Sequence, residues 1–302
     1  MKKLLSLFLS LALIFCSLIT GTITSGCNDK KSISVLTIGS SYLFNATDQL
    51  YPVLESLGYD DITVANIYSS GCKINAHMQN IEQDKGAYEY RKADKTTGKL
   101  KIVFTKIDGV NYPGKYKMSD ALSERAWDYV VINQGATEQG VTETFEKLPD
   151  YLAYVKSKAP SAKISFHMGW TFSNISTLPE FANYYESSED VMYQAIINAI
   201  KSQVEPLNFY KIIPNGTVVR NARTSNLEEL RITYDPTTYG HATADFGRYM
   251  VALTVATTLT GKDINNISYK PESVTEEEKA IAIQCVLSAI NNPYQTTEII
   301  NG

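Results

Sequence analysis

Stretches typical of strands and of helices alternate along the chain from residue 34 onward. The strand-like stretches are apolar or β-branched, and most end in small or polar residues: 34–38, 61–68, 127–132, 162–168 and 209–213. This alternation predicts an α/β domain whose parallel sheet has helices on both faces. Because parallel strands end at the same edge of a sheet, the polar residues that follow them are expected to lie close together.

Helical periodicity marks the segments between the strands. Leu50, Val53, Leu54 and Leu57 recur at i, i+3, i+4 and i+7, which is one apolar stripe of a helix. This helix is predicted to begin near Thr47. Further helices are predicted over 191–204, 249–259 and 274–290.

Residues of about 84–118 interrupt the alternation. Two extended runs surround a Thr97-Gly98 turn, which predicts an inserted β-hairpin, a flap that could wall a substrate cleft. Its tyrosines, Tyr88 and Tyr90, have two interpretations: they bind the faces of sugar rings, or they cover the base of the hairpin itself.

The first residues have the pattern of an export signal. Met1-Lys2-Lys3 precedes an apolar run over 4–19, and Thr24-Ser25-Gly26-Cys27 resembles a lipobox with Thr24 where Leu is usual. The pattern predicts a signal peptide over 1–26, a short tether over 27–33 and a single domain over 34–302. A lipid on Cys27 would anchor that domain to the membrane surface, outside the cytoplasm. The alternatives are ordinary cleavage or an accidental cysteine.

The net charge limits the ligands that the domain is expected to bind, and the cysteine content limits its possible disulfides and metal sites. The formal net charge is -4, and removal of residues 1–26 takes away two lysines and no acids, which gives -6. An acidic domain argues against nucleic acid or an anionic membrane surface as the ligand. Cys72 and Cys285 could form a disulfide or simply pack in the core. The chain has no CxxC or HExxH motif, so neither a structural zinc site nor a cofactor is predicted.

Candidate chemistry lies at the predicted strand ends. Ser41 follows the first strand and precedes a helix, where backbone N–H groups favour negative charge. A serine needs a base and a set of donors for the developing oxyanion before it can act as a nucleophile. Gly71 ends the second strand and could donate its N–H without steric hindrance. Asn133 or Gln134 ends the third strand and could add an amide donor.

Three histidines could supply the base. His241 lies in a loop that contains proline, glycine and a nearby acid, Asp235, which could fix the tautomer of the imidazole. His77 lies at the start of a predicted helix after Gly71, and His167 ends the fourth strand next to Gly169-Trp170, and for both a packing or hydrogen-bonding role is expected. His241 is therefore the predicted base.

In their order and spacing, these motifs resemble the blocks of the SGNH (GDSL-type) hydrolase superfamily. The resemblance is strongest to a bacterial branch described only as a domain of unknown function, and it rests on residues 38–41, 70–72, 127–135, 213–216 and 241–249. It implies a flavodoxin-like three-layer α/β/α sandwich with a parallel five-stranded sheet. It also implies hydrolysis of esters, often acetyl groups on carbohydrates. By position, Ser41 would be the nucleophile, Ser41, Gly71 and Gln134 or Asn133 the oxyanion hole, and His241 the base.

Three positions depart from the superfamily pattern. Ser40 replaces the usual Asp or Asn before the nucleophile, and the third block reads Asn-Gln-Gly in place of Gly-x-Asn-Asp. The third departure is Thr238, which occupies the position of the acid three residues before the histidine. Asp235 could reach His241 if the loop doubles back. Otherwise a hydroxyl, a carbonyl or Asp245 would orient the imidazole.

The sequence thus predicts an exported serine esterase that forms an acyl-enzyme on Ser41. Its substrate would be a small-molecule or carbohydrate ester, with O-acetyl esters as the leading class. A catalytically silent surface lipoprotein that binds glycan is the alternative, because Thr238 replaces the acid. A phosphate-binding domain is disfavoured, since no glycine-rich phosphate loop follows the first strand. The oligomeric state is left open.

Overall fold

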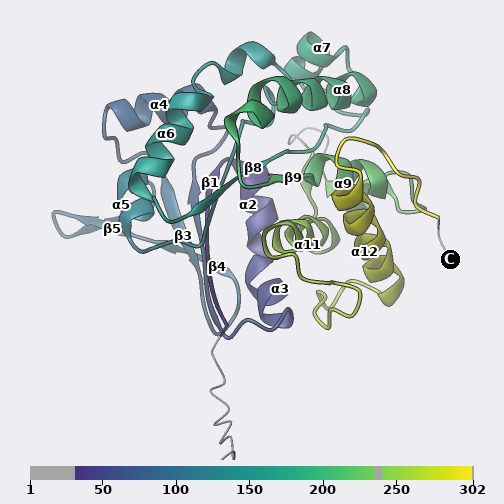
Figure 1. Cartoon of the computed structure of the whole chain (residues 1–302), viewed down its shortest axis with the longest axis horizontal. Helices are drawn as coiled ribbons and strands as arrows, with labels where there is room; N and C mark the ends of the chain where they lie inside the picture. The colour runs from purple at the N-terminus through teal and green to yellow at the C-terminus, as the bar shows by residue number, and fades with distance from the viewer. Residues whose placement is uncertain (1–30, 235–239, 301–302) are drawn as a thin grey trace, which may run out of the picture. The chain divides into compact units, whose positions relative to one another are not determined.

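A seven-stranded sheet forms the centre of the computed structural model, which describes residues 31–234 and 240–300 (Figure 1). In spatial order its strands are β4 (Leu100–Val103), β3 (Glu89–Ala93), β2 (Asp61–Tyr68), β1 (Ser32–Gly39), β7 (Tyr129–Asn133), β8 (Lys163–His167) and β9 (Ile212–Ile213). The neighbours from β2 to β9 pair in parallel, whereas β2–β3 and β3–β4 pair antiparallel. The predicted α/β class is confirmed, and the five parallel strands are the five strand-like stretches of the sequence.

Helices cover both faces of this sheet and complete three layers (Figure 1). One face is covered by α11 (Phe246–Thr260) and four helices that pack against it. These are α2 (Ser41–Asp48), α3 (Leu50–Ser56), α9 (Asn215–Ala222) and α12 (Glu276–Asn291). The other face carries α4 (Ile74–Glu82), α5 (Met118–Ser123) and α6 (Leu148–Lys158). Val35, Leu36 and Ile38 of β1 are fully buried because helices cover β1 on both sides.

Shorter elements connect the layers. They are β5 (Thr105–Ile107), β6 (Val110–Tyr112), the 3₁₀ turns η1 (Thr142–Phe145) and η3 (Glu205–Leu207), α7 (Pro179–Tyr185), α8 (Glu189–Ala199), the π turn η2 (Ile200–Val204), α10 (Glu229–Ile232), β10 (Thr233–Tyr234) and β11 (His241–Ala242). The predicted helix over 191–204 is therefore α8 followed by one wider turn. Strands β10 and β11 pair antiparallel outside the main sheet.

The inserted residues differ from the expected flap. Strands β3 and β4 form a hairpin, but β3 is paired with β2, so the hairpin extends the main sheet. Tyr88 and Tyr90 are 1% exposed, so they cover the base of this insertion and are not available to bind the faces of sugar rings. Only the separate β5–β6 hairpin projects away from the sheet (Figure 1).

Cys72 and Cys285 are both buried free thiols, so they pack in the interior and do not form a disulfide. The predicted signal peptide and Cys27 lie outside the described residues. Among the helices of the described part of the chain, none combines the length and hydrophobicity needed to cross a bilayer.

Candidate active site

The nucleophile candidate opens a helix. Strand β1 ends at Gly39, and α2 begins at Ser41 itself, ahead of the helix predicted from near Thr47, which corresponds to α3. The periodicity did not reveal α2 because Asn45 and Thr47 are polar yet buried, which hides its apolar stripe. Ser40 is the N-cap residue and makes no side-chain cap. The first N–H groups of α2 therefore lie beside the Ser41 hydroxyl, with the positive end of the helix dipole.

The Asn133 side chain lies against Gly39, two residues before Ser41. A Cβ atom added at Gly39 would lie 2.0 Å from Oδ1 of Asn133, so only glycine fits there. Asn133 ends β7 and is 2% exposed. Its amide group thus lies against the turn that leads into Ser41.

The other amide candidate has structural hydrogen bonds. Oε1 of Gln134 accepts hydrogen bonds of 2.9 Å from the backbone N–H groups of Ile74 and Gly135. Its Nε2 donates to Oγ1 of Thr144 at 2.9 Å. These bonds join the end of β7 to α4 and η1. They commit Gln134 to the framework and leave Asn133 as the remaining amide candidate, although neither residue is among those that line the pocket.

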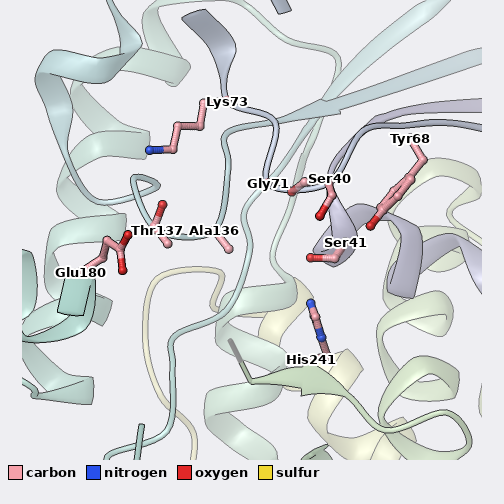
Figure 2. A pocket seen from close by; sticks show the side chains of 10 residues that line it. Ser40, Ser41, Tyr68, Gly71, Lys73, Ala136, Thr137, Glu180 and His241 are labelled. Atoms are coloured by element: carbon pink, nitrogen blue, oxygen red, sulfur yellow. The ribbon is translucent and has the colours of Figure 1, made fainter. Parts of the chain in front are cut away.

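Gly71 supplies a bare backbone beside the serine. Its φ of +61° lies in the left-handed region, which glycine adopts without strain. Figure 2 shows Gly71 next to Ser40 and Ser41 at the wall of the pocket. Loops that follow β1 and β2 therefore meet at one edge of the sheet, as their parallel pairing requires.

His241 faces Ser41 across the floor of the same pocket (Figure 2). Two hydrogen bonds hold the backbone on either side of it. Nε1–H of Trp170 donates to the Gly240 carbonyl at 2.8 Å, and the Ala242 N–H donates to Oδ1 of Asn45 at 3.0 Å. Because Asn45 lies one helical turn after Ser41, α2 positions both Ser41 and the backbone next to His241.

Aromatic packing supports this arrangement. Tyr42 and Trp170 stack with ring centroids 4.1 Å apart, and the Tyr42 ring lies 6.2 Å from that of His241 in an edge-on orientation. Nε2 of Gln139 in turn donates to the Trp170 carbonyl at 2.6 Å. The sequence did not single out Asn45, Trp170 or Gln139, because their partners lie far away along the chain.

Asp235 and Asp245 are the two candidates for the acid that orients His241. Asp235 and Thr238 lie outside the described residues. Asp245 is described, and its Oδ2 accepts hydrogen bonds from Arg231 and Ser273. Burial opposes its ionisation, but these donors, with the Phe246 N–H, hold the pKa of the Asp245 carboxyl below its usual value. The contacts assign Asp245 to an ion pair with Arg231, which argues against it as the acid for His241.

The other two histidines are buried in the core. His77 stacks between Tyr88 and Tyr151, and its Nδ1 lies 3.0 Å from the Tyr88 hydroxyl. Nε2 of His167 lies 3.0 Å from Nδ2 of Asn215. Burial lowers the pKa of both imidazoles to about 3. Both therefore have the predicted packing role.

The pocket above Ser41 has a volume of about 280 Å³. Its lining residues are Ser40, Ser41, Tyr68, Ser70, Gly71, Lys73, Ala136, Thr137, Glu180 and His241. Lys73 forms an ion pair with Glu138, which joins the loops after β2 and β7. Glu180 lies on α7, a helix that was not predicted from the sequence. Pro179, the first residue of α7, is a typical signal of a helix start. Within the described residues, no cluster of histidine, cysteine or acidic side chains could hold a metal ion.

The fold and the site define an α/β protein with a serine and a histidine facing each other at the carboxyl edge of its sheet. A family model described as "Domain of unknown function (DUF4886)" matches residues 34–289, so the chain belongs to the DUF4886 family. It is similar to the crystal structure of a DUF4886 family protein from Bacteroides uniformis, with 27% identity and a TM-score of 0.79. The match covers 89% of this chain and 98% of that one.

More distant similarity extends to hydrolase structures. A Slackia heliotrinireducens protein assigned to the SGNH hydrolases has 14% identity and a TM-score of 0.48, covering 76% of this chain and all of that one. The lipase/acylhydrolase from Enterococcus faecalis has 10% identity and a TM-score of 0.45, covering 74% and 93%. No curated protein matches the chain. The predicted membership of a family described only as a domain of unknown function is confirmed.

Proposed function

We propose that this protein is a serine esterase of the SGNH type. The observation that carries the proposal is the Ser41 hydroxyl at the first residue of α2, facing His241 in a pocket that Gly71 also lines. Three segments that are distant in the sequence thus supply a nucleophile, a base and backbone donors. This is the minimum set that ester hydrolysis through a serine requires.

The reaction follows from these groups. Oγ of Ser41 attacks the ester carbonyl carbon while His241 takes its proton. The backbone N–H groups of Ser41 and Gly71, with the Asn133 amide, would donate to the oxyanion of the tetrahedral intermediate. The C–O bond to the alcohol then breaks, and His241 returns the proton to the leaving oxygen. A water molecule deprotonated by His241 then attacks the acyl carbon, the bond from that carbon to Oγ of Ser41 breaks, and His241 returns the proton to Oγ as the acid leaves.

The size of the pocket supports a short acyl group. A volume of about 280 Å³ is at the lower end for small-molecule sites. It suits an acetyl ester of a small or hydroxylated alcohol better than a long acyl chain. A carbohydrate O-acetyl ester is therefore the proposed substrate class.

The proposal includes export and a lipid anchor on Cys27. Its support is the basic start and apolar run of residues 1–19 and the lipobox-like 24–27. Metabolic labelling with a radioactive fatty acid tests it in cells that produce the full chain. Label in the wild type and none in Cys27→Ser would support the anchor, and equal label in both would contradict it.

The decisive test is hydrolysis of 4-nitrophenyl acetate, together with labelling of Ser41 by a fluorophosphonate. The Ser41→Ala variant is expected to form no fluorophosphonate adduct. Its kcat should be more than about 10³-fold lower than that of the wild type, because loss of a catalytic serine lowers kcat by at least that factor. We propose Asp235 as the acid that orients His241, so Asp235→Asn should lower kcat by up to about 10⁴-fold. Asp245→Asn is the matched control and should change kcat far less. A folded wild-type protein that neither hydrolyses the ester nor forms an adduct would contradict the esterase proposal and leave the glycan-binding alternative.

A further inference from the structure

The pocket wall opposite the serine carries a carboxylate. Glu180 is half-buried at the start of α7, and Figure 2 shows its side chain across the pocket from Ser41 and His241. Helix α7 is anchored by Phe181 and Tyr185, which are 0% and 1% exposed. The anchored helix therefore holds the Glu180 carboxylate at a defined position. Glu180 takes no part in the proposed hydrolysis itself.

The charge of Glu180 is not compensated within the described part of the chain. No ion pair of Glu180 occurs among the described residues, whereas Lys73, the cation that lines this pocket, is paired with Glu138. The Glu138 side chain is 15% exposed, so the pair is partly shielded from solvent. The wall that holds Lys73, Glu138 and Glu180 thus carries one net negative charge. A carboxylate accepts hydrogen bonds from hydroxyl or ammonium groups and repels other carboxylates.

The opposite side of the pocket is aromatic. Tyr68 lies on the other side of Ser41 from Glu180 (Figure 2). The guanidinium of Arg91 lies 4.1 Å from the Tyr68 ring centroid and 4.4 Å from that of Phe44, which holds Tyr68 in place. A fixed aromatic ring on one side and a carboxylate on the other suit a ring that has one apolar face and several hydrogen-bond donors.

We propose that Glu180 is a specificity-determining residue that binds the alcohol part of the ester. It accepts hydrogen bonds from hydroxyl or ammonium groups of that part, with Thr137 beside it and Tyr68 opposite. The substrate is thus an ester of a polyhydroxylated or amino alcohol without negative charge. This inference rests on the proposed esterase function and adds the selectivity of the same site.

The test compares four acetyl esters in the wild type and Glu180→Gln: 4-nitrophenyl acetate, 6-O-acetylglucose, 6-O-acetylglucosamine and an O-acetylated glucuronic acid. A hydrogen bond to a charged group contributes more than one to a neutral group, so kcat/KM for the two uncharged or cationic sugar esters should fall about 10-fold. The value for 4-nitrophenyl acetate should stay within about 2-fold, because that alcohol offers no donor. The value for the glucuronic acid ester should rise. Glu55→Gln, an exposed glutamate on α3, is the matched control and should change nothing.

The pattern of loss distinguishes the two kinds of donor. Equal losses for the glucose and glucosamine esters indicate hydroxyl groups, and a larger, salt-sensitive loss for glucosamine indicates the ammonium. Unchanged or uniformly changed kcat/KM across all four esters in Glu180→Gln would overturn the inference and leave the esterase function intact. A wild type inactive on every ester would instead refute the function. The subsite is then tested by NMR titration with free glucosamine and glucose, and equal affinity in the wild type and Glu180→Gln would overturn it.

Discussion

At the scale of single residues, the site depends on two glycines, one that leaves room for a side chain and one that adopts a left-handed backbone conformation. Gly39 leaves the space that Asn133 occupies, and Gly71 adopts a φ of +61° beside the serine. Ser41, Gly71 and His241 were all singled out from the sequence because each follows a strand or lies in a loop with turn residues. The structure places all three at one pocket.

Asn45 is a residue that the sequence could not reveal as part of the site. Its Oδ1 accepts the Ala242 N–H at 3.0 Å, next to His241, and both groups are buried. In Asn45→Ala this N–H loses its acceptor, at a cost of about 1–3 kcal/mol, and the base is less well positioned against Ser41. We expect kcat on 4-nitrophenyl acetate to fall about 10- to 100-fold with KM little changed.

The control for this positioning role is Asn45→Asp, which keeps an oxygen acceptor and should recover most of kcat. Steady-state kinetics measure kcat and KM separately, and thermal unfolding confirms that each variant is folded. If Asn45→Ala loses stability but keeps the wild-type kcat in the folded fraction, Asn45 is a packing residue only.

At the scale of elements, helices and strands with a strong apolar pattern could be predicted from the sequence. Helices whose pattern is weak or is interrupted by polar residues could not. The five parallel strands and helices α3, α8, α11 and α12 match the predicted segments, because each is a nearly continuous apolar run or carries apolar residues at helical spacing. Helices α2 and α7 were missed. Buried polar groups such as Asn45 and Thr47 interrupt the pattern of α2, and α7 buries just Phe181 and Tyr185, too few apolar residues to form a recognisable stripe.

One buried arginine joins the elements behind the base. The Arg223 side chain is 8% exposed and forms ion pairs with Glu189 of α8 and Glu229 of α10. It also donates to Oγ1 of Thr171 at 2.6 Å. Because α10 leads directly into β10, which pairs with the strand of His241, Arg223 stabilises the framework of the site.

Removal of this side chain should destabilise the protein strongly. In Arg223→Ala, Glu229 loses its buried cation and Glu189 keeps only its ion pair with Arg220, so we expect the free energy of unfolding to fall by about 3 kcal/mol. The matched control is Lys95→Ala, which removes the exposed ion pair with Asp61 and should cost less than about 1 kcal/mol. Urea unfolding monitored by circular dichroism measures both. Equal, small losses in the two variants would contradict the assigned role of Arg223.

At the scale of the whole molecule, the sequence could predict which segments reach the sheet edge but not which side chains meet there. Parallel pairing brings the ends of β1, β2 and β7 together, and that follows from pattern alone. The pairing of Lys73 with Glu138, or the stacking of Tyr42 on Trp170, depends on loop conformations with no periodic signal. The candidate pocket was therefore predictable at the side of Ser41, Gly71 and His241 and not at its opposite wall.

The two buried histidines make the stability of the whole fold depend on pH. Burial lowers the pKa of His77 and His167 from 6.5 to about 3. Below pH 6.5 the unfolded chain binds protons at both imidazoles and the folded protein does not. Stability is thus fully present above about pH 6.5 and is lost as the pH falls toward 3, by about 2 kcal/mol for each histidine at pH 5.

This dependence can be assigned to each histidine by comparing losses between two pH values. The wild type should lose about 4 kcal/mol of unfolding free energy between pH 7.5 and pH 5, and His167→Gln should lose about half of that, whatever its stability at pH 7.5. Carboxyl groups contribute little in this range because their ordinary pKa values lie near or below 4.5. Urea titrations of both proteins at the two pH values measure the losses. If His167→Gln lost as much stability as the wild type, the folded protein would already bind a proton at His167, and the buried imidazole would not be the neutral core group that its surroundings indicate.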